Sequence, residues 1–153
     1  MKFYTRLILF LLINFGALGL GAYLMNNGPR TEWYAALDKA PWTPPGWVFG
    51  FAWTTVMICF SIFMAKLTEA KNIKIILGLF AIQFVLNVSW NFVFFNQHHI
   101  LLGMINLILL LGLITIILFK FKSQVKVYTV FILPYFFWLI VANSLNGYIL
   151  FTN

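Results

Sequence analysis

The sequence predicts an all-α integral membrane protein: one domain, residues 1–153, built as a bundle of five transmembrane helices. Hydrophobic residues make up 63% of the chain and charged residues only 8%, which is too few to cover a water-soluble surface. Uncharged apolar windows of about 20 residues, the length that crosses a bilayer, recur along almost the whole chain. They lie approximately at residues 7–25, 44–65, 75–95, 100–119 and 127–151.

The basic residues predict the orientation of this bundle. If the N-terminus is cytoplasmic, Arg30 and Lys39 lie outside and the other eight of the 10 basic residues lie inside. These eight are Lys2, Arg6, Lys66, Lys71, Lys74, Lys120, Lys122 and Lys126. Because cytoplasmic loops of membrane proteins are enriched in Lys and Arg, we expect the N-terminus inside and the C-terminus outside. Basic residues spread over helix ends also argue against a nucleic-acid-binding patch.

The first window, 7–25, follows Lys2 and Arg6 and could be mistaken for a secretory signal. Its apolar run exceeds the 7–15 residues or so of a signal core, so we expect a retained helix. Ala17 and Gly21 are spaced four apart, which favours close approach of another helix. Cys59, the single cysteine, excludes an intramolecular disulfide.

The second window begins at Thr43-Pro44-Pro45, where a capping hydroxyl and prolines in the first turn favour a helix start. Gly46 and Gly50 repeat the spacing typical of close helix packing. By contrast, the window 100–119 is almost uniformly apolar, so we expect it to face lipid or a second subunit.

The windows 75–95 and 127–151 carry polar faces that should point inward, because amides are unfavourable toward lipid. One face holds Gln83, Asn87 and Asn91 with Trp90 beside them, and the other holds Tyr135, Trp138, Ala142 and Asn146 after Pro134. Pro134 should bend its helix. Two interpretations stay open for these side chains: hydrogen bonds between helices, or contacts to a ligand.

Depth favours a ligand site. With a rise of about 1.5 Å per residue, Trp53, Asn87 and Ala142 all lie about 12–14 Å below the outer ends of their predicted helices. An aromatic layer with a few uncharged polar groups suits a flat apolar ligand. The helices contain no mid-membrane charge, which argues against a proton-coupled pump or ion channel. No metal site is expected, because His98-His99 has no visible third ligand.

The link 26–43 is the only connection long enough to hold extra structure. Its segment 31–39 can form two helical turns with Trp33, Tyr34 and Leu37 on one side. Either this segment belongs to an interfacial aromatic belt, or it is a lid over the chamber. We favour the lid, on the same predicted outer side as the polar layer, because only this link is long enough to reach over the chamber.

These residues resemble a known family, the tryptophan-rich sensory proteins and translocator proteins (TspO/MBR), also called peripheral-type benzodiazepine receptors. The resemblance is carried by Trp33-Tyr34, Leu37, the run Pro41-Trp42-Thr43-Pro44-Pro45-Gly46-Trp47-Val48-Phe49-Gly50, Trp53, Gln83, Leu86-Asn87, Trp90-Asn91, Phe94-Phe95, Leu133-Pro134-Tyr135, Trp138, Ala142 and Leu145-Asn146. It spans essentially the entire chain and implies five transmembrane helices, commonly in a homodimer, with a cavity covered by the first link.

The resemblance also implies ligands: porphyrins and haem, isoquinoline-carboxamide and benzodiazepine-type drugs and, in eukaryotic members, cholesterol. No separate cofactor is implied, and the tetrapyrrole enters as a ligand. The implied cavity residues are Tyr34, Pro44, Phe49, Trp53, Met57, Asn87, Trp90, Asn91, Trp138, Ala142 and Leu145. The cholesterol-type pattern lacks its basic residue after Tyr148, which argues against sterol recognition here.

Three functions follow as hypotheses. The first is tetrapyrrole binding for transport or sensing in a bacterial cell membrane. The second, proposed for some members of the family, is an enzyme that degrades porphyrin with light and oxygen through Trp53 and Trp138. The third is a structural subunit whose cavity holds lipid.

Overall fold

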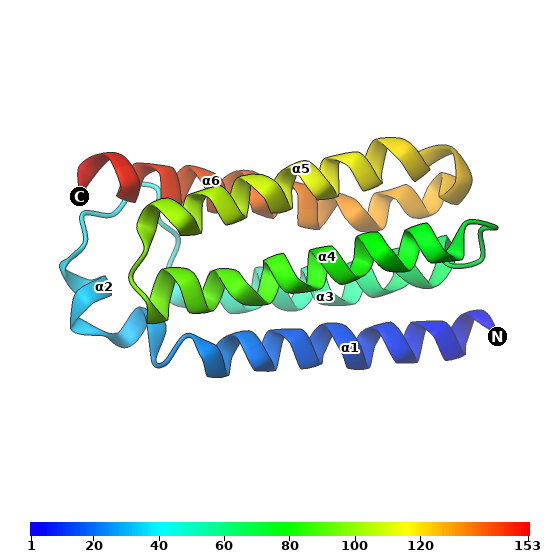
Figure 1. Ribbon diagram of the computed structural model, residues 1–153, viewed down its shortest axis with the longest axis horizontal. Coiled ribbons are helices and arrows are strands. Elements are labelled where there is room, and N and C mark those ends of the chain that lie inside the picture. Colours follow the sequence, from blue (N-terminus) through cyan, green and yellow to red (C-terminus); the bar gives the residue numbers. More distant parts are fainter.

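The computed structural model describes residues 1–153, and all of its regular elements are helical. Five long helices lie side by side in Figure 1: α1 (Phe3–Leu24), α3 (Gly46–Leu67), α4 (Ile73–Asn91), α5 (Ile100–Val125) and α6 (Leu133–Thr152). The shorter segments are η1 (Gly28–Arg30), α2 (Glu32–Ala36), η2 (Phe92–Asn96) and η3 (Lys126–Ile132). The prediction of an all-α protein is confirmed.

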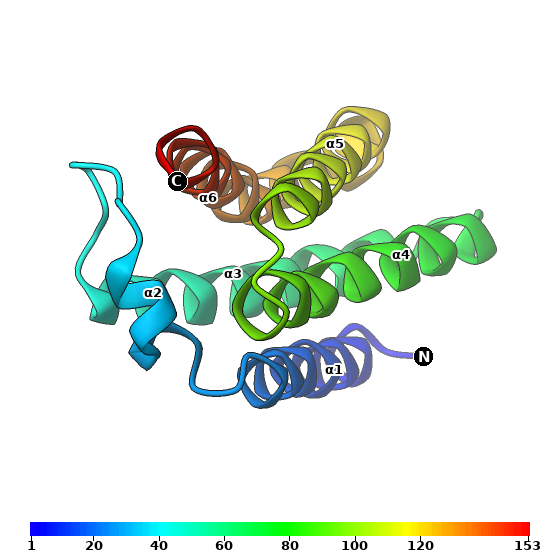
Figure 2. The same cartoon turned by 60° about the vertical axis from the view of Figure 1, so that its left-hand side comes forward.

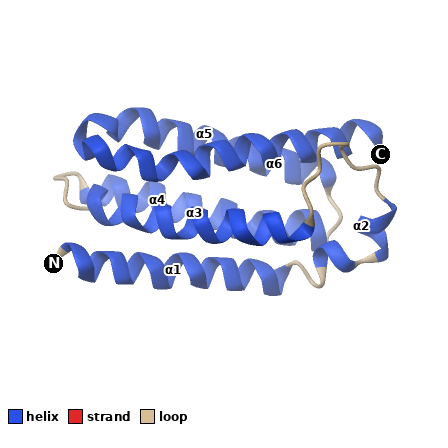
Figure 3. Cartoon of the chain, turned by 180° about the vertical axis from the view of Figure 1, so that it is seen from behind, coloured by secondary structure: helices blue, strands red, loops and turns tan.

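Four segments are long and apolar enough to cross a membrane: Phe3–Arg30, Gly46–Leu67, Ile73–Asn96 and Ile100–Thr152. The last has 53 residues and contains both α5 and α6, which lie antiparallel to each other in Figure 3. The two termini lie at opposite ends of the bundle (Figure 1). The number of crossings and the direction of the chain through the membrane stay predictions.

The long helices are arranged with the α3 and α4 pair in the middle. Helix α1 packs against α3 and α4 on one side, whereas α5 and α6 pack against each other and against α4 and α3 on the other side (Figure 2). The link after α1 forms η1 and α2 at the end of the bundle where the C-terminus lies. Arg30 and Lys39 lie at this end, and the other eight basic residues lie at the N-terminal end.

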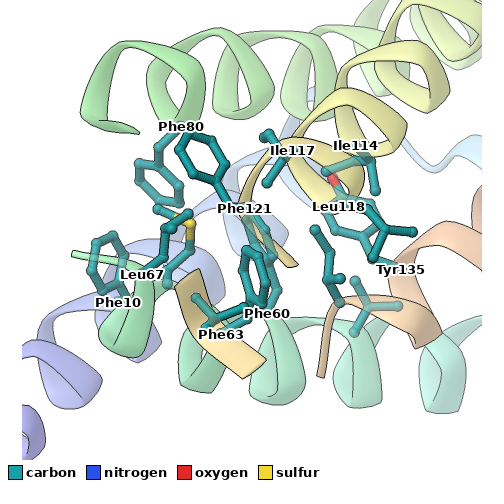
Figure 4. Close-up of a cluster of buried hydrophobic side chains, with 14 of the residues drawn as sticks. Phe10, Phe60, Phe63, Leu67, Phe80, Ile114, Ile117, Leu118, Phe121 and Tyr135 are labelled. Carbon is teal, nitrogen blue, oxygen red and sulfur yellow. The ribbon is translucent and has the colours of Figure 1, made fainter. Parts of the chain in front are cut away.

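The larger hydrophobic core contains residues of all five long helices, and several aromatic rings meet within it (Figure 4). Phe60 of α3 is fully buried, and its ring centroid lies 6.1 Å from Phe80 of α4 and 5.1 Å from Tyr135 of α6. Phe10 of α1 meets Phe80 edge-on at 5.0 Å, and Phe121 of α5 is 1% exposed. Because lipid provides no hydrophobic drive between helices, this close ring packing is what holds the bundle together.

Pairs of small residues predicted close helix packing at two places, and the structure shows a close contact at one of them. A Cβ on Gly21 would lie 2.6 Å from Asn91 Nδ2, so α1 approaches α4 closely, as the Ala17 and Gly21 spacing predicted. Gly46 and Gly50 make no such contact within this chain, because no atom lies within 4 Å of a Cβ built there. Both glycines lie on the outward face of α3.

The window 100–119 does present an exposed side, with Leu101, Ile108 and Ile116 more than half exposed, but it also has a buried side that was not expected. One side of α5 is buried in the core through Leu107, Leu110, Ile114, Ile117 and Phe121. A uniformly apolar helix carries no periodic signal that separates its buried side from its outer side.

Two helix ends differ from the predicted windows. Helix α4 continues into the π-helical turn η2, in which the consecutive residues Phe94 and Phe95 are both buried. The helical segment that contains Pro134 starts at Lys126, close to the predicted residue 127, but its first part is the 3₁₀ segment η3, and Pro134 lies in the first turn of α6 directly after it. The change from 3₁₀ to α-helix therefore lies beside Pro134, whose missing N–H needs no partner in the first turn of an α-helix.

Candidate functional site

Four aromatic side chains meet where α3 and α6 face each other, and we call Phe49, Trp53, Tyr135 and Trp138 the α3/α6 aromatic cluster. The ring of Trp138 lies 5.5 Å from Phe49 and 6.5 Å from Trp53, between ring centroids. Trp53 lies 6.0 Å from Tyr135. All three pairs meet nearly at right angles, the edge-to-face arrangement that aromatic rings prefer. One turn beyond Trp53, Met57 is buried in the main core.

The polar face of α4 is bound to this cluster through one hydroxyl. Tyr135 Oη accepts hydrogen bonds from Gln83 Nε2 at 2.6 Å and from Asn87 Nδ2 at 2.8 Å. Tyr135 is 0% exposed, and Gln83 is 2% exposed. One N–H of the Asn87 amide therefore bonds within the protein, where it orients Tyr135.

Two further donors of the same layer also bond within the protein. Trp90 Nε1 donates to Asn146 Oδ1 at 3.3 Å, and Asn146 Nδ2 donates to the Ile100 carbonyl at 3.3 Å. Four buried polar atoms have no partner: Gln83 Oε1, Asn106 Oδ1, Asn143 Oδ1 and Trp138 Nε1. Three of these are acceptors, so the unused hydrogen-bonding capacity inside the bundle is mostly that of an acceptor.

An apolar groove runs along the outside of the α3/α6 aromatic cluster. It has a volume of about 350 Å³ and is open to the surface between α3 and α6. Its lining consists of Val48, Phe51, Ala52, Thr55, Val56, Pro134, Phe137, Trp138 and Val141. None of these side chains is charged, so the groove suits an apolar molecule that reaches Trp138 from the side of the bundle.

A second group of rings lies where the link meets the end of α4. We call Trp33, Tyr34, Trp90, Phe94 and Phe95 the outer aromatic cluster. Trp90 stacks on Phe94 with 5.2 Å between centroids, and Trp33 meets Phe94 edge-on at 5.5 Å. Tyr34 lies 5.4 Å from Phe95. Burial raises the pKa of the Tyr34 hydroxyl above its usual value of 10.0.

The link is fastened at two places. On the α4 side, Trp33 stacks on His98 at 4.1 Å, so this imidazole packs on the link. On the α6 side, Asn153 Oδ1 accepts from the Asp38 backbone N–H at 2.9 Å, and Trp42 Nε1 donates to Ser144 Oγ at 3.1 Å. The link thus spans from the end of α4 to the end of α6 across one end of the bundle.

This arrangement can be compared with known proteins. A profile of the TspO/MBR family matches residues 8–152 of the chain. The chain belongs to the TspO/MBR family. The tryptophan-rich protein TspO of Chlorobaculum tepidum is 32% identical over 141 residues, which cover 90% of this chain and 89% of that protein. The protein CrtK of Rhodobacter capsulatus is 35% identical over 118 residues, 74% of each chain. The translocator protein of Bos taurus is 28% identical over 135 residues, 83% of this chain and 80% of that one.

The structure groups only part of the cavity residues that the TspO/MBR resemblance implies. Phe49, Trp53 and Trp138 lie together in the α3/α6 aromatic cluster, with Met57 directly beneath. Ala142, one turn from Trp138, packs against the main core.

The other implied TspO/MBR cavity residues lie apart from that cluster. Tyr34 and Trp90 belong to the outer aromatic cluster, and Leu145 is buried at 8% exposure. Asn91 donates to the Asn87 carbonyl at 3.3 Å and lies against Gly21, which places it toward α1. Pro44 is half-buried shortly before α3 starts.

Sequence reasoning missed one polar pair in the TspO/MBR bundle. Asn14 Nδ2 of α1 donates to Ser61 Oγ of α3 at 2.8 Å, and both residues are almost completely buried. The signal was present, because a lone Asn in the apolar run of α1 needs a polar partner inside the bundle.

Proposed function

We propose that this TspO/MBR protein is a membrane receptor or transporter that binds tetrapyrroles, porphyrins and haem among them, at the α3/α6 aromatic cluster. The observation that carries the proposal is the edge-to-face group of Phe49, Trp53 and Trp138, with an indole N–H that has no protein partner. Flat aromatic ligands gain stacking energy on such rings. The same site is proposed to take isoquinoline-carboxamide or benzodiazepine-type molecules.

In this proposal, binding separates rings that touch each other in the free protein. Trp53 and Trp138 are in contact, so a macrocycle has to move between them or displace one of them. Asn87 acts indirectly by holding Tyr135, which in turn packs against Trp53. The link acts as a lid whose two fastenings have to loosen before a large ligand can enter from the α2 end.

We further propose that the chain crosses the membrane five times, with its N-terminus in the cytoplasm, in a bacterial cell membrane. The gathering of eight basic residues at the N-terminal end supports this direction. A homodimer is proposed as the assembly. Cysteine accessibility at introduced sites in the loop 68–72 and in the link, measured on intact cells, tests the orientation.

Porphyrin titration of the purified protein, followed by quenching of tryptophan fluorescence, tests the proposed site. We expect Trp53→Phe and Trp138→Phe to weaken porphyrin binding, because a smaller ring loses stacking area and the indole N–H is lost. Trp47→Phe is the matched control, since Trp47 is 72% exposed on the outer face of α3. Equal affinity in all three variants would remove the α3/α6 aromatic cluster as the porphyrin site.

A second function is favoured by one observation, the chain of oxidisable rings Trp138, Trp53 and Tyr135, whose centroids are 6.5 Å and 6.0 Å apart. Such rings can pass electrons or radicals if illuminated porphyrin and dioxygen react beside them. Mass spectrometry of porphyrin after light and dark incubation tests this oxidative degradation. If products form equally fast when both indoles are replaced by Phe, the enzymatic function is refuted.

A further inference from the structure

The charged groups of a tetrapyrrole create a problem that the proposed site does not solve. Porphyrins of the protoporphyrin type carry carboxylate side chains, which are ionised at neutral pH. A carboxylate that is buried without a partner is strongly unfavourable. The ring can lie among aromatic side chains, but each carboxylate needs a donor or a cation elsewhere.

The interior of the bundle offers no cation, and its one buried N–H group without any partner, Trp138 Nε1, is uncharged and cannot balance two carboxylates. All charged residues of the chain lie at the two ends of the bundle, so the middle contains no cation. The amide nitrogens of Gln83 and Asn87 donate to Tyr135, and that of Asn146 donates to the Ile100 carbonyl. Three of the four buried atoms without partners are oxygens, which repel a carboxylate. The carboxylates therefore have to lie at one end.

At the end of the bundle where α2 and the C-terminus lie, only two basic side chains are available, and the ammonium group of one already has hydrogen-bond partners. Lys39 Nζ donates to the carbonyls of Tyr34 at 2.7 Å, Leu37 at 3.0 Å and Ala35 at 3.3 Å. It also lies 4.7 Å from the centre of the Tyr34 ring. This ammonium group closes the C-terminal end of α2 and has no donor left.

Arg30 is the free cation at this end. Its guanidinium makes no hydrogen bond and no ion pair, although the backbone that carries it is held firmly. Arg30 N–H donates to the Asn27 carbonyl at 2.8 Å, and Thr31 Oγ1 donates to the Gly28 carbonyl at 2.8 Å. Three residues further along, Trp33 packs on Phe94 in the outer aromatic cluster.

We infer that Arg30 is the carboxylate-binding residue of this protein and selects acidic tetrapyrroles over uncharged ones. The inference rests on the proposed function and names the part of the ligand that the link recognises. A guanidinium offers two parallel N–H groups to a carboxylate, which gives direction as well as charge. Because Arg30 lies on the link, binding of the carboxylate also favours the closed position of the link.

The test compares protoporphyrin IX with its dimethyl ester, at a pH near 8 and in an uncharged detergent. Arg30→Gln should weaken binding of the acid by about three- to tenfold and leave binding of the ester within about twofold. Arg30→Lys should fall between, because it keeps the charge and loses the paired N–H groups. High salt should weaken binding of the acid and leave binding of the ester unchanged. Lys39→Gln is the matched control, and it should affect acid and ester to the same extent.

Two results would overturn the inference and leave the proposed function standing: unchanged binding of the acid by Arg30→Gln, or equal losses for acid and ester. If neither porphyrin binds the unmodified protein, the proposed function fails and the inference fails with it. Circular dichroism of each variant checks that the helices are intact.

Discussion

Replacing Tyr135 by Phe removes one oxygen atom and leaves two buried amides without an acceptor. Gln83 Nε2 and Asn87 Nδ2 both donate to this hydroxyl, at 2.6 Å and 2.8 Å. An orphaned buried donor costs about 1–3 kcal/mol in a water-soluble protein. Hydrogen bonds between membrane helices average about 0.6 kcal/mol, with a maximum near 1.7. Two such bonds therefore predict a loss of about 1–3 kcal/mol in the free energy of unfolding.

The measurement is reversible unfolding by sodium dodecyl sulfate in mixed micelles, followed by circular dichroism. Tyr148→Phe is the control, because the Tyr148 hydroxyl makes no hydrogen bond to the protein and its removal should change stability by less than about 0.5 kcal/mol. A double-mutant cycle of Tyr135→Phe with Gln83→Leu should give a coupling of about 0.5–1.5 kcal/mol. A loss no larger than that of Tyr148→Phe, or no coupling, would refute the claim that this network ties α4 to α6.

Gly21→Val should destabilise the bundle by about 1–3 kcal/mol, because its Cβ would lie 2.6 Å from Asn91 Nδ2 of α4. Gly19→Val is the control in the same unfolding assay and should be nearly neutral, because no atom lies within 4 Å of its Cβ. Lys126 has a φ of 53°, which glycine adopts more easily than lysine, so Lys126→Gly should stabilise the fold by about 1 kcal/mol and raise the midpoint of thermal unfolding. An unchanged midpoint would contradict strain at this residue. Trp33→Ala should speed proteolysis of the link, because the residue packs on two rings, and an unchanged cleavage rate would show that this fastening is weak. Because the pKa of Tyr34 is raised from 10.0, its contribution to stability should be complete below pH 10 and decrease as pH rises through the higher folded value; absorbance at the tyrosinate band measures this titration.

The sequence predicted the polar faces well because they obey a simple period. Four-residue spacing placed Gln83 and Asn87 on one face, and the same reasoning placed Tyr135 on another, and these two faces meet in the structure. The link was also recognised by its length and by its aromatic residues. In each case a polar or aromatic residue occurs among apolar ones. Such a residue can be recognised in the sequence without knowing which helices pack against it.

The sequence could not predict features in which this contrast is missing. Most of α5 is apolar on every side, and the one polar signal in its middle that points to a neighbour is Asn106, which donates to Ser89 of α4 at 2.8 Å. The spacing of Gly46 and Gly50 matches a packing motif, yet which helix approaches them depends on the tilt of α3, and none does. The π-helical turn at Phe94 and Phe95 depends on tertiary contacts with the link, which no local pattern encodes.

The two fastenings of the link have an experimental consequence, because each of them contains its own fluorophore. Trp33 lies on the imidazole of His98, and Trp42 donates to Ser144 on α6. Variants that keep one of these two tryptophans and replace the other five of the six by Phe would emit from one edge of the link at a time. Time-resolved emission could then distinguish a link that peels away from α4 first from one that leaves α6 first, without any attached dye.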